Sequence, residues 1–234
     1  MKFKTSSVRT LAWLVVATAL TACASKMDNN SKEPRHRYFF DAFLGQDSYS
    51  KVFDDHTLEK RVHSEFEPVM TAFATIWNSS MREAYIREMA RQFRYDDAQE
   101  AALAKEQLAE NEAYIVFVIS ASTREPSWND FEKQHSMWRI TLESPDGKLR
   151  LDPERVEAIS EKDETAKYFY QHMNSFGRTY KIRFPRDAFR QMDRVSLHIT
   201  GTRGYVIFDF KLPQPQAPHL DNPTEKSSTS EPAE

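Results

Sequence analysis

The chain has 234 residues, a formal net charge of −3 and a single cysteine. This mild acidity argues against a nucleic-acid partner, because nucleic acids favour proteins with basic patches. One cysteine also excludes an intramolecular disulfide. Stability must then come from a hydrophobic core, which a chain of this length can bury.

The first 22 residues have the layout of a secretory signal peptide. Lys2, Lys4 and Arg9 give a positive start, and residues 11–20 (LAWLVVATAL) follow without a charge. This apolar run is about ten residues long, whereas a helix needs ~20 residues to cross the bilayer core. We therefore predict a cleaved leader over residues 1–22 rather than a membrane-spanning helix.

The leader ends in Leu20-Thr21-Ala22-Cys23, which resembles the lipobox of bacterial lipoproteins. In that family the cysteine sulfur receives a diacylglyceryl group, cleavage falls just before the cysteine, and the new amino group is usually acylated too. The resemblance implies lipidation of Cys23 and recognition of Leu20, Thr21 and Ala22 by the signal peptidase. Several acyl chains would hold the protein stably on a membrane, whereas one chain holds it only marginally.

The residues after the cysteine bear on the location of the anchor. In Gram-negative lipoproteins an Asp at that place commonly signals retention at the inner membrane, and here Ala24 and Ser25 follow instead. The resemblance thus implies the outer membrane, with the body facing the periplasm. Residues 23–37 are polar and predict a flexible tether between the lipid and the body.

Residues 38–112 predict a helical region. Residues 38–53 are too apolar for a free linker, so we expect them to pack against the domain, partly as a short helix. The next apolar positions follow helical steps of three and four: Leu58, Val62, Phe66, Val69, Phe73 and Ile76. Pro68 lies within this stretch and predicts a kink in its helix.

Two capping signals predict two further helices before residue 112. Ser80 with Glu83, and Asp97 with Glu100, have the spacing of a capping box, in which each side chain satisfies a free N–H of the first turn. The last of these helices, over residues 101–111, has a thin apolar face, so we expect it to be mostly solvated.

Residues 113–212 predict a β-rich region. Residues 114–119 (YIVFVI) are a continuous β-branched and aromatic run, typical of a strand covered on both faces. Alternating patterns and turns predict further strands at residues 136–143, 148–151, 156–159, 180–184, 195–199 and 205–210. The expected fold class is α+β, with N-terminal helices packed on a C-terminal antiparallel β-sandwich-like sheet. Residues 213–234 are proline-rich and predict a disordered tail.

Two loops carry candidate recognition residues. Trp128 and Phe131 lie in the loop at residues 123–135, and Phe176 and Arg178 lie in a turn before a later strand. Exposed aromatic side chains on loops often mark recognition surfaces. The alternative is that these side chains anchor their loops under the edge of the sheet.

Signals for catalysis are weak. His56, Glu59 and His63 could share one face of a helix and hold zinc, but a solvated helix face explains them equally well, so we predict no metal site and no cofactor. The pairs Asp54-Asp55 and Asp96-Asp97 precede helical stretches and predict capping. The chain has no Gly-x-Ser-x-Gly elbow and no P-loop pattern.

These patterns leave functions of different classes open. One is a membrane-anchored, non-enzymatic binding or assembly module for an envelope protein or a cell-wall component. Another is an envelope hydrolase with a site assembled from dispersed acids or histidines, for which a deep cleft holding a carboxyl of raised pKa would be evidence. The third is a carrier of a small ligand or carbohydrate, with a pocket lined by Trp128, Trp138 or Phe176.

Overall fold

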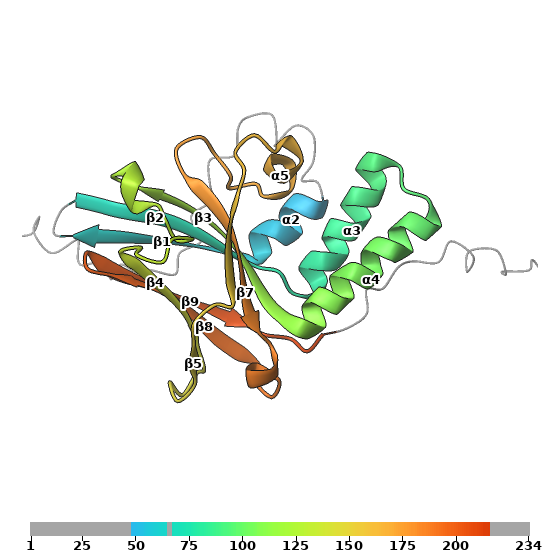
Figure 1. Cartoon of the computed structure of the whole chain (residues 1–234). Coiled ribbons are helices and arrows are strands. Elements are labelled where there is room, and N and C mark those ends of the chain that lie inside the picture. The colour runs from blue at the N-terminus through green and yellow to red at the C-terminus, as the bar shows by residue number, and fades with distance from the viewer. Residues whose placement is uncertain (1–47, 65–66, 216–234) are drawn as a thin grey trace, which may run out of the picture. The chain divides into compact units, whose positions relative to one another are not determined.

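The computed structural model describes residues 48–64 and 67–215, and this part contains two antiparallel sheets (Figure 1). The large sheet has, in spatial order, β1 (Thr57–Ser64), β2 (Glu67–Ile76), β3 (Tyr114–Thr123), β7 (Arg178–Pro185) and β6 (Arg155–Ile159). The small sheet has β5 (Arg150–Leu151), β4 (Trp138–Glu143), β8 (Arg194–Gly201) and β9 (Gly204–Lys211). The helices are α2 (Ser48–Asp55), α3 (Ser79–Phe93), α4 (Asp97–Ala113) and α5 (Glu164–Phe169).

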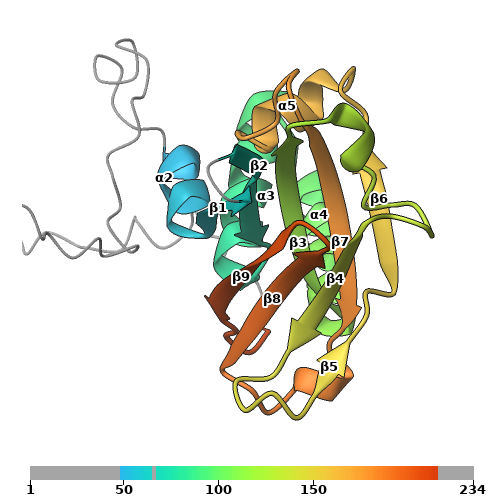
Figure 2. The same cartoon turned by 90° about the vertical axis from the view of Figure 1, so that its left-hand side faces the viewer.

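The large sheet is the middle layer of three. From its central strand β3, Ile115, Phe117 and Ile119 point into a core shared with the small sheet. The alternate side chains Val116 and Val118 pack on the opposite face, in a second core with side chains of α2, α3 and α5. Figure 2 shows α3 and α4 on the other side of the large sheet from β8 and β9. The predicted burial of β3 on both faces is confirmed.

The expected fold class is wrong, because the first long helix predicted in the N-terminal half is a β-hairpin. β1 and β2 pair antiparallel, with Thr57 opposite Thr75 and Arg61 opposite Thr71. Pro68 lies near the start of β2, opposite His63 and beside a register irregularity, which is a position where a strand tolerates proline. The described chain is therefore sheet-rich, and helices do not make up its N-terminal half.

The physical reason lies in the alanines of β2. Met70, Ala72, Ala74 and Ile76 are buried and alternate with Thr71, Phe73 and Thr75 on the other face. This is the period of two that a strand requires. The helical pattern counted only large apolar side chains and so left out Ala72 and Ala74. The large apolar residues that remain between Leu58 and Ile76 fit helical spacing by coincidence. Phe66, which the helical pattern included, lies outside the described residues.

Other elements follow the sequence more closely. The short helix expected before residue 53 is α2, and the predicted strands correspond to β3 through β9. Helices α3 and α4 form, but their caps lie earlier than predicted. Asn78 accepts from the Met81 N–H at 3.1 Å, and Asp96 forms a reciprocal capping box with Gln99. The sequence patterns did not predict α5.

Truncating the side chain of Phe117 should lower the stability of the fold strongly. Its ring is fully buried and lies 5.2 Å from the ring of Phe210 and 6.1 Å from that of Phe184, measured between centroids. Phe117→Ala should lower the free energy of unfolding by about 4 kcal/mol, measured by urea denaturation. Tyr205→Ala, at a side chain 67% exposed on β9, should lower it by about 0.5 kcal/mol or less. Equal losses in the two variants would contradict this core.

Candidate functional site

The loops at one end of the sandwich bring the predicted recognition residues together. We call this surface the loop end, and it comprises residues 124–137, 172–178 and 201–204. The guanidinium of Arg178 donates to the Asn129 carbonyl at 3.2 Å and to the Glu132 carboxylate at 3.1 Å. The Tyr180 hydroxyl also donates to the Asn129 carbonyl, at 2.9 Å. Two loops that are distant in sequence are thereby held side by side.

Two of the predicted recognition aromatics have structural roles at the loop end. Phe131 is buried and stacks on Tyr180, with the ring centroids 4.9 Å apart. Trp128 is half-buried, and its carbonyl accepts a hydrogen bond from the indole N–H of Trp138 at 2.9 Å. The guanidinium of Arg203 covers the ring of Trp128, at 4.7 Å from the ring centroid. For Phe131, the alternative that loop aromatics anchor their loop is the one observed.

Phe176 is the exception, because 90% of its surface is exposed. The loop that carries it is positioned by close contacts. The backbone N–H of Phe176 donates to the side-chain oxygen of Asn174 at 2.9 Å. A Cβ atom at Gly177 would lie only 2.4 Å from the Ala121 carbonyl oxygen, so glycine allows the loop to lie directly against β3. The ring therefore faces solvent from a defined backbone.

The three residues considered for zinc do not share a helical face. His56 lies between α2 and β1, and Glu59 and His63 lie on β1. The His56 Nδ1 is 2.7 Å from the Val52 carbonyl, and Glu59 accepts from Arg61 at 3.0 Å. Among the residues that the structure describes, no cluster of histidine, cysteine or acidic side chains is suited to a metal ion.

A charged network lies where α4 covers the helix-facing side of the large sheet. The Glu110 carboxylate accepts from Arg82 of α3 at 2.8 Å, from Lys181 of β7 at 2.7 Å and from Arg183 of β7 at 2.9 Å. Arg183 also pairs with Glu157 of β6. Arg82 is almost fully buried and further donates to the Trp77 carbonyl at 3.0 Å and to the Gln107 side chain at 2.7 Å.

This network controls the ionisation of Glu110. Burial by itself would raise the pKa of the carboxyl, but the charge of Arg82 and the ammonium of Lys181 lower that pKa to about 2. The pKa of Glu88 is also lowered, because hydrogen bonds from Arg91, Tyr168 and Gln92 outweigh its burial. Both carboxyls are therefore held in the ionised form.

The helical residues of this network were not among the site residues that the sequence predicted. The pattern of α4 indicated a mostly solvated helix, because leucines are sparse in it. The available signal was polar: Glu110 and Asn111 follow Gln107 by three and four residues, so both lie on the same side of the helix as Gln107. Two of them, Gln107 and Asn111, are buried, and Asn111 accepts from Arg186 at 2.9 Å.

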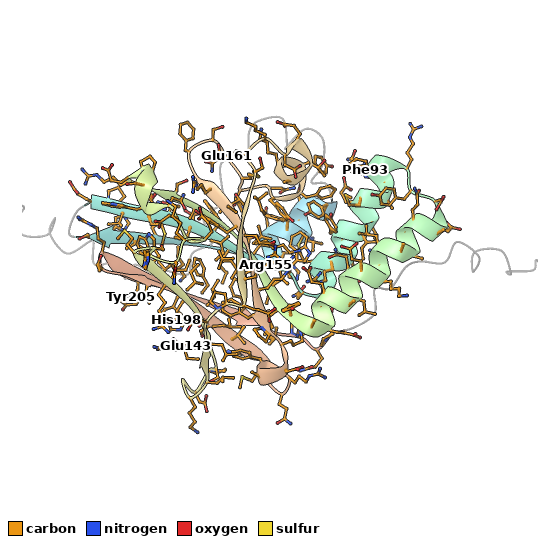
Figure 3. All side chains as sticks on the ribbon, in the orientation of Figure 1. Phe93, Glu143, Arg155, Glu161, His198 and Tyr205 are labelled. Carbon is orange, nitrogen blue, oxygen red and sulfur yellow. The ribbon has the colours of Figure 1, made fainter. Side chains whose placement is uncertain are left out.

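A carboxylate–imidazole pair lies on the outer face of the small sheet (Figure 3). The His198 Nδ1 is 3.5 Å from the Glu143 carboxylate, which also pairs with Arg150 at 2.6 Å. His198 points away from the core, since its neighbours Leu197 and Ile199 are in the core. Neither His198 nor Glu143 lines either of the two hollows described next.

The described surface has two notable hollows. The larger one, about 570 Å³, lies between the α2–β1 junction, the start of β8 and the end of β9, and Asp55, Asp193 and Lys211 are among the residues that line it. The smaller one, about 350 Å³, lies between α3, α5, β6 and β7. We call the smaller one the edge hollow, because β6 is an edge strand of the large sheet. Trp128, Trp138 and Phe176 line neither hollow.

Replacing Glu110 tests the role of the charged network. Glu110→Gln leaves the buried Arg82 without its carboxylate, so the free energy of unfolding should fall by about 3 kcal/mol near neutral pH. The folded state lowers the pKa of Glu110 from 4.5 to about 2, so ionised Glu110 stabilises the fold fully above about pH 5 and loses that effect as the pH falls towards 2. Urea denaturation at several pH values should show the gap between wild type and variant narrowing over this range.

The matched control is Glu106→Gln, at an exposed position of the same helix. It should change the free energy of unfolding by about 0.5 kcal/mol or less. A gap for Glu110→Gln that stays constant from pH 7 to pH 2 would show that the carboxylate does not act through its charge.

The leader and the lipobox, with Leu20, Thr21, Ala22 and Cys23, lie outside the described residues. Within the described part, no helix has the length and apolar character needed to span a membrane. Comparison of the chain with protein-family models, with curated proteins and with solved structures finds no match.

Proposed function

We propose that this chain is a lipid-anchored lipoprotein of the bacterial envelope whose body is a non-enzymatic binding or assembly module. The observation that carries the binding role is Phe176, an aromatic ring that is 90% exposed on a positioned loop. Leaving such a ring in water is unfavourable, and burying it against a partner recovers that free energy. A loop that is already ordered also loses little entropy when it binds.

The surroundings of Phe176 suit a protein contact. Arg178, two residues along the chain, pairs with Glu132 at 3.1 Å, and Arg203 covers Trp128 on the same loop end. An aromatic residue with charged and polar side chains on the same surface has the composition of an interface hot spot with its rim. The partner would be an envelope protein or a cell-wall component.

The ionisation of the acids favours this function over a hydrolase. A general acid needs a raised pKa, so that it is protonated at neutral pH. The two helix-layer carboxyls with shifted pKa, Glu88 and Glu110, are shifted downward instead. The Glu143–His198 pair lies on a sheet face, and neither residue lines a hollow where substrate could be enclosed.

Anchoring would assist such a module. A lipid at Cys23 confines the body to the membrane surface, which raises its effective concentration near other membrane-held proteins, so contacts of low intrinsic affinity suffice. Residues 23–37 would act as the tether, and the location that the lipobox resemblance implies is the outer membrane, with the body in the periplasm.

Cys23→Ser tests the anchor. We expect the variant to fold but to remain unprocessed and unlipidated, because serine offers no thiol for the diacylglyceryl group. Cells grown with a radioactive fatty acid should label the wild type and leave the variant unlabelled. Equal incorporation in both proteins would eliminate the proposed lipid anchor.

The contact surface is tested by placing a photo-crosslinking phenylalanine analogue at position 176 in intact cells. We expect one envelope partner to be captured in a fixed ratio, and Phe176→Ala to reduce its recovery with the chain about tenfold or more. The control position is Phe93, which is 51% exposed at the end of α3 and is labelled in Figure 3. Capture at position 93 and not at 176 would refute the loop end as the contact surface.

A further inference from the structure

The edge hollow has the composition of a ligand site that is separate from the loop end. We propose that it binds one neutral mono- or disaccharide. This inference goes beyond the proposed protein contact, because it concerns a different surface and a different class of ligand. It rests on the aromatic wall of the hollow, two hydroxyls without partners and a balance of charges.

The aromatic wall comes from α3 and from the region of α5. Tyr85, Phe169 and Tyr170 all line the hollow, and the rings of Tyr85 and Phe169 meet edge to face with centroids 4.8 Å apart. The ring of Trp77 packs against both tyrosines, at 5.5 Å from Tyr85 and 5.6 Å from Tyr170. The aromatic wall is therefore held in place by its own contacts. Phe169 is buried, so the apolar surface on which the C–H face of a sugar ring can stack comes from Tyr85 and Tyr170.

The hydroxyls of Tyr85 and Tyr170 are available to a ligand. Neither one forms a hydrogen bond to another residue in the described part of the chain, although both side chains are largely covered. Burial raises the pKa of Tyr85 to about 12 and raises that of Tyr170 as well, so both groups keep their proton at neutral pH. Solvent reaches both hydroxyls, since the buried side-chain atoms without a partner in the described part of the chain lie on Arg82 and Arg186. A ligand that supplies acceptors can replace that solvent with hydrogen bonds of its own.

Charges of both signs border the hollow. Lys181 lines it, with the ammonium 2.7 Å from Glu110, and Glu157 and Asp163 line it as well. The Asp163 carboxylate already accepts from the Ala166 N–H at 2.9 Å, as the cap of α5. An anionic ligand would meet two carboxylates, and a cationic ligand would meet the ammonium. A neutral polyhydroxylated ligand can instead accept from Lys181 and the tyrosines and donate to the acids.

The size of the hollow agrees with this class of ligand. Its volume of about 350 Å³ is at the lower end of the range for small-molecule sites, which suits one or two sugar rings. It is open to solvent beside β6, so a longer glycan could place a terminal unit in it. The position follows from the fold, because β6 lies beyond β7 at the edge of the sheet and α5 closes one end of the space.

The test uses the full-length chain in a polyoxyethylene detergent, which carries no sugar of its own. The neutral probes are N,N′-diacetylchitobiose and maltose, and the charged comparison probes are glucuronate and glucosamine. Ligand-observed NMR titration should show saturable binding of at least one neutral probe, tighter than that of either charged probe. Saturable binding of neither neutral probe, or tighter binding of a charged one, would overturn the proposal.

Hydroxyl deletions locate the site. Tyr85→Phe and Tyr170→Phe keep the rings and should each weaken binding of the neutral probe about 3- to 10-fold, as expected for the loss of one hydrogen bond. Tyr205→Phe removes an exposed hydroxyl on β9 and should leave the affinity unchanged. Phe176→Ala should also leave it unchanged, which separates this proposal from the loop-end contact. Unchanged affinity in both hollow variants, with cooperative urea unfolding retained, would exclude the edge hollow as the site.

Discussion

The constraint on which the structure depends is that the large sheet is buried on both faces. An antiparallel sheet commonly leaves one face to solvent, but β3 sends Phe117 into the core with the small sheet and Val118 into the core with the helices. The helix-facing side of β7 is different, because it carries Lys181 and Arg183 rather than apolar side chains. Covering that side with a helix layer requires a partner for each charge.

Helix α4 meets this requirement with polar side chains. Glu110 pairs with the charges of β7, Gln107 accepts from Arg82, and Asn111 accepts from Arg186. Such contacts depend on geometry more strictly than apolar contacts do, since a misplaced helix would leave buried charges unpaired. Lys181 of β7 belongs to this charged network and also lines the edge hollow, so one residue contributes to both.

The sequence predicted those elements whose buried positions carry large apolar side chains. The strand at Tyr114–Thr123 and the alternating strands after it were found because valine, isoleucine and aromatic residues mark each buried position. The β1–β2 hairpin was missed because alanine marks two of its buried positions, and Ala72 and Ala74 carry little hydrophobic signal. The charged network could not be found in this way, since a buried glutamate and an exposed one are identical in sequence until the topology places cations around one of them.

The loop aromatics show the same limit at the level of function. Phe131 and Phe176 are the same residue type in neighbouring loops, yet one stacks on Tyr180 in the core and the other is 90% exposed. The two differ in their surroundings: Phe131 packs in the core, whereas Phe176 precedes Gly177, whose backbone lies directly against β3, and its own ring faces solvent. Composition can therefore indicate a candidate recognition loop, but only the packing of the folded chain decides which of its aromatic side chains is buried and which is exposed.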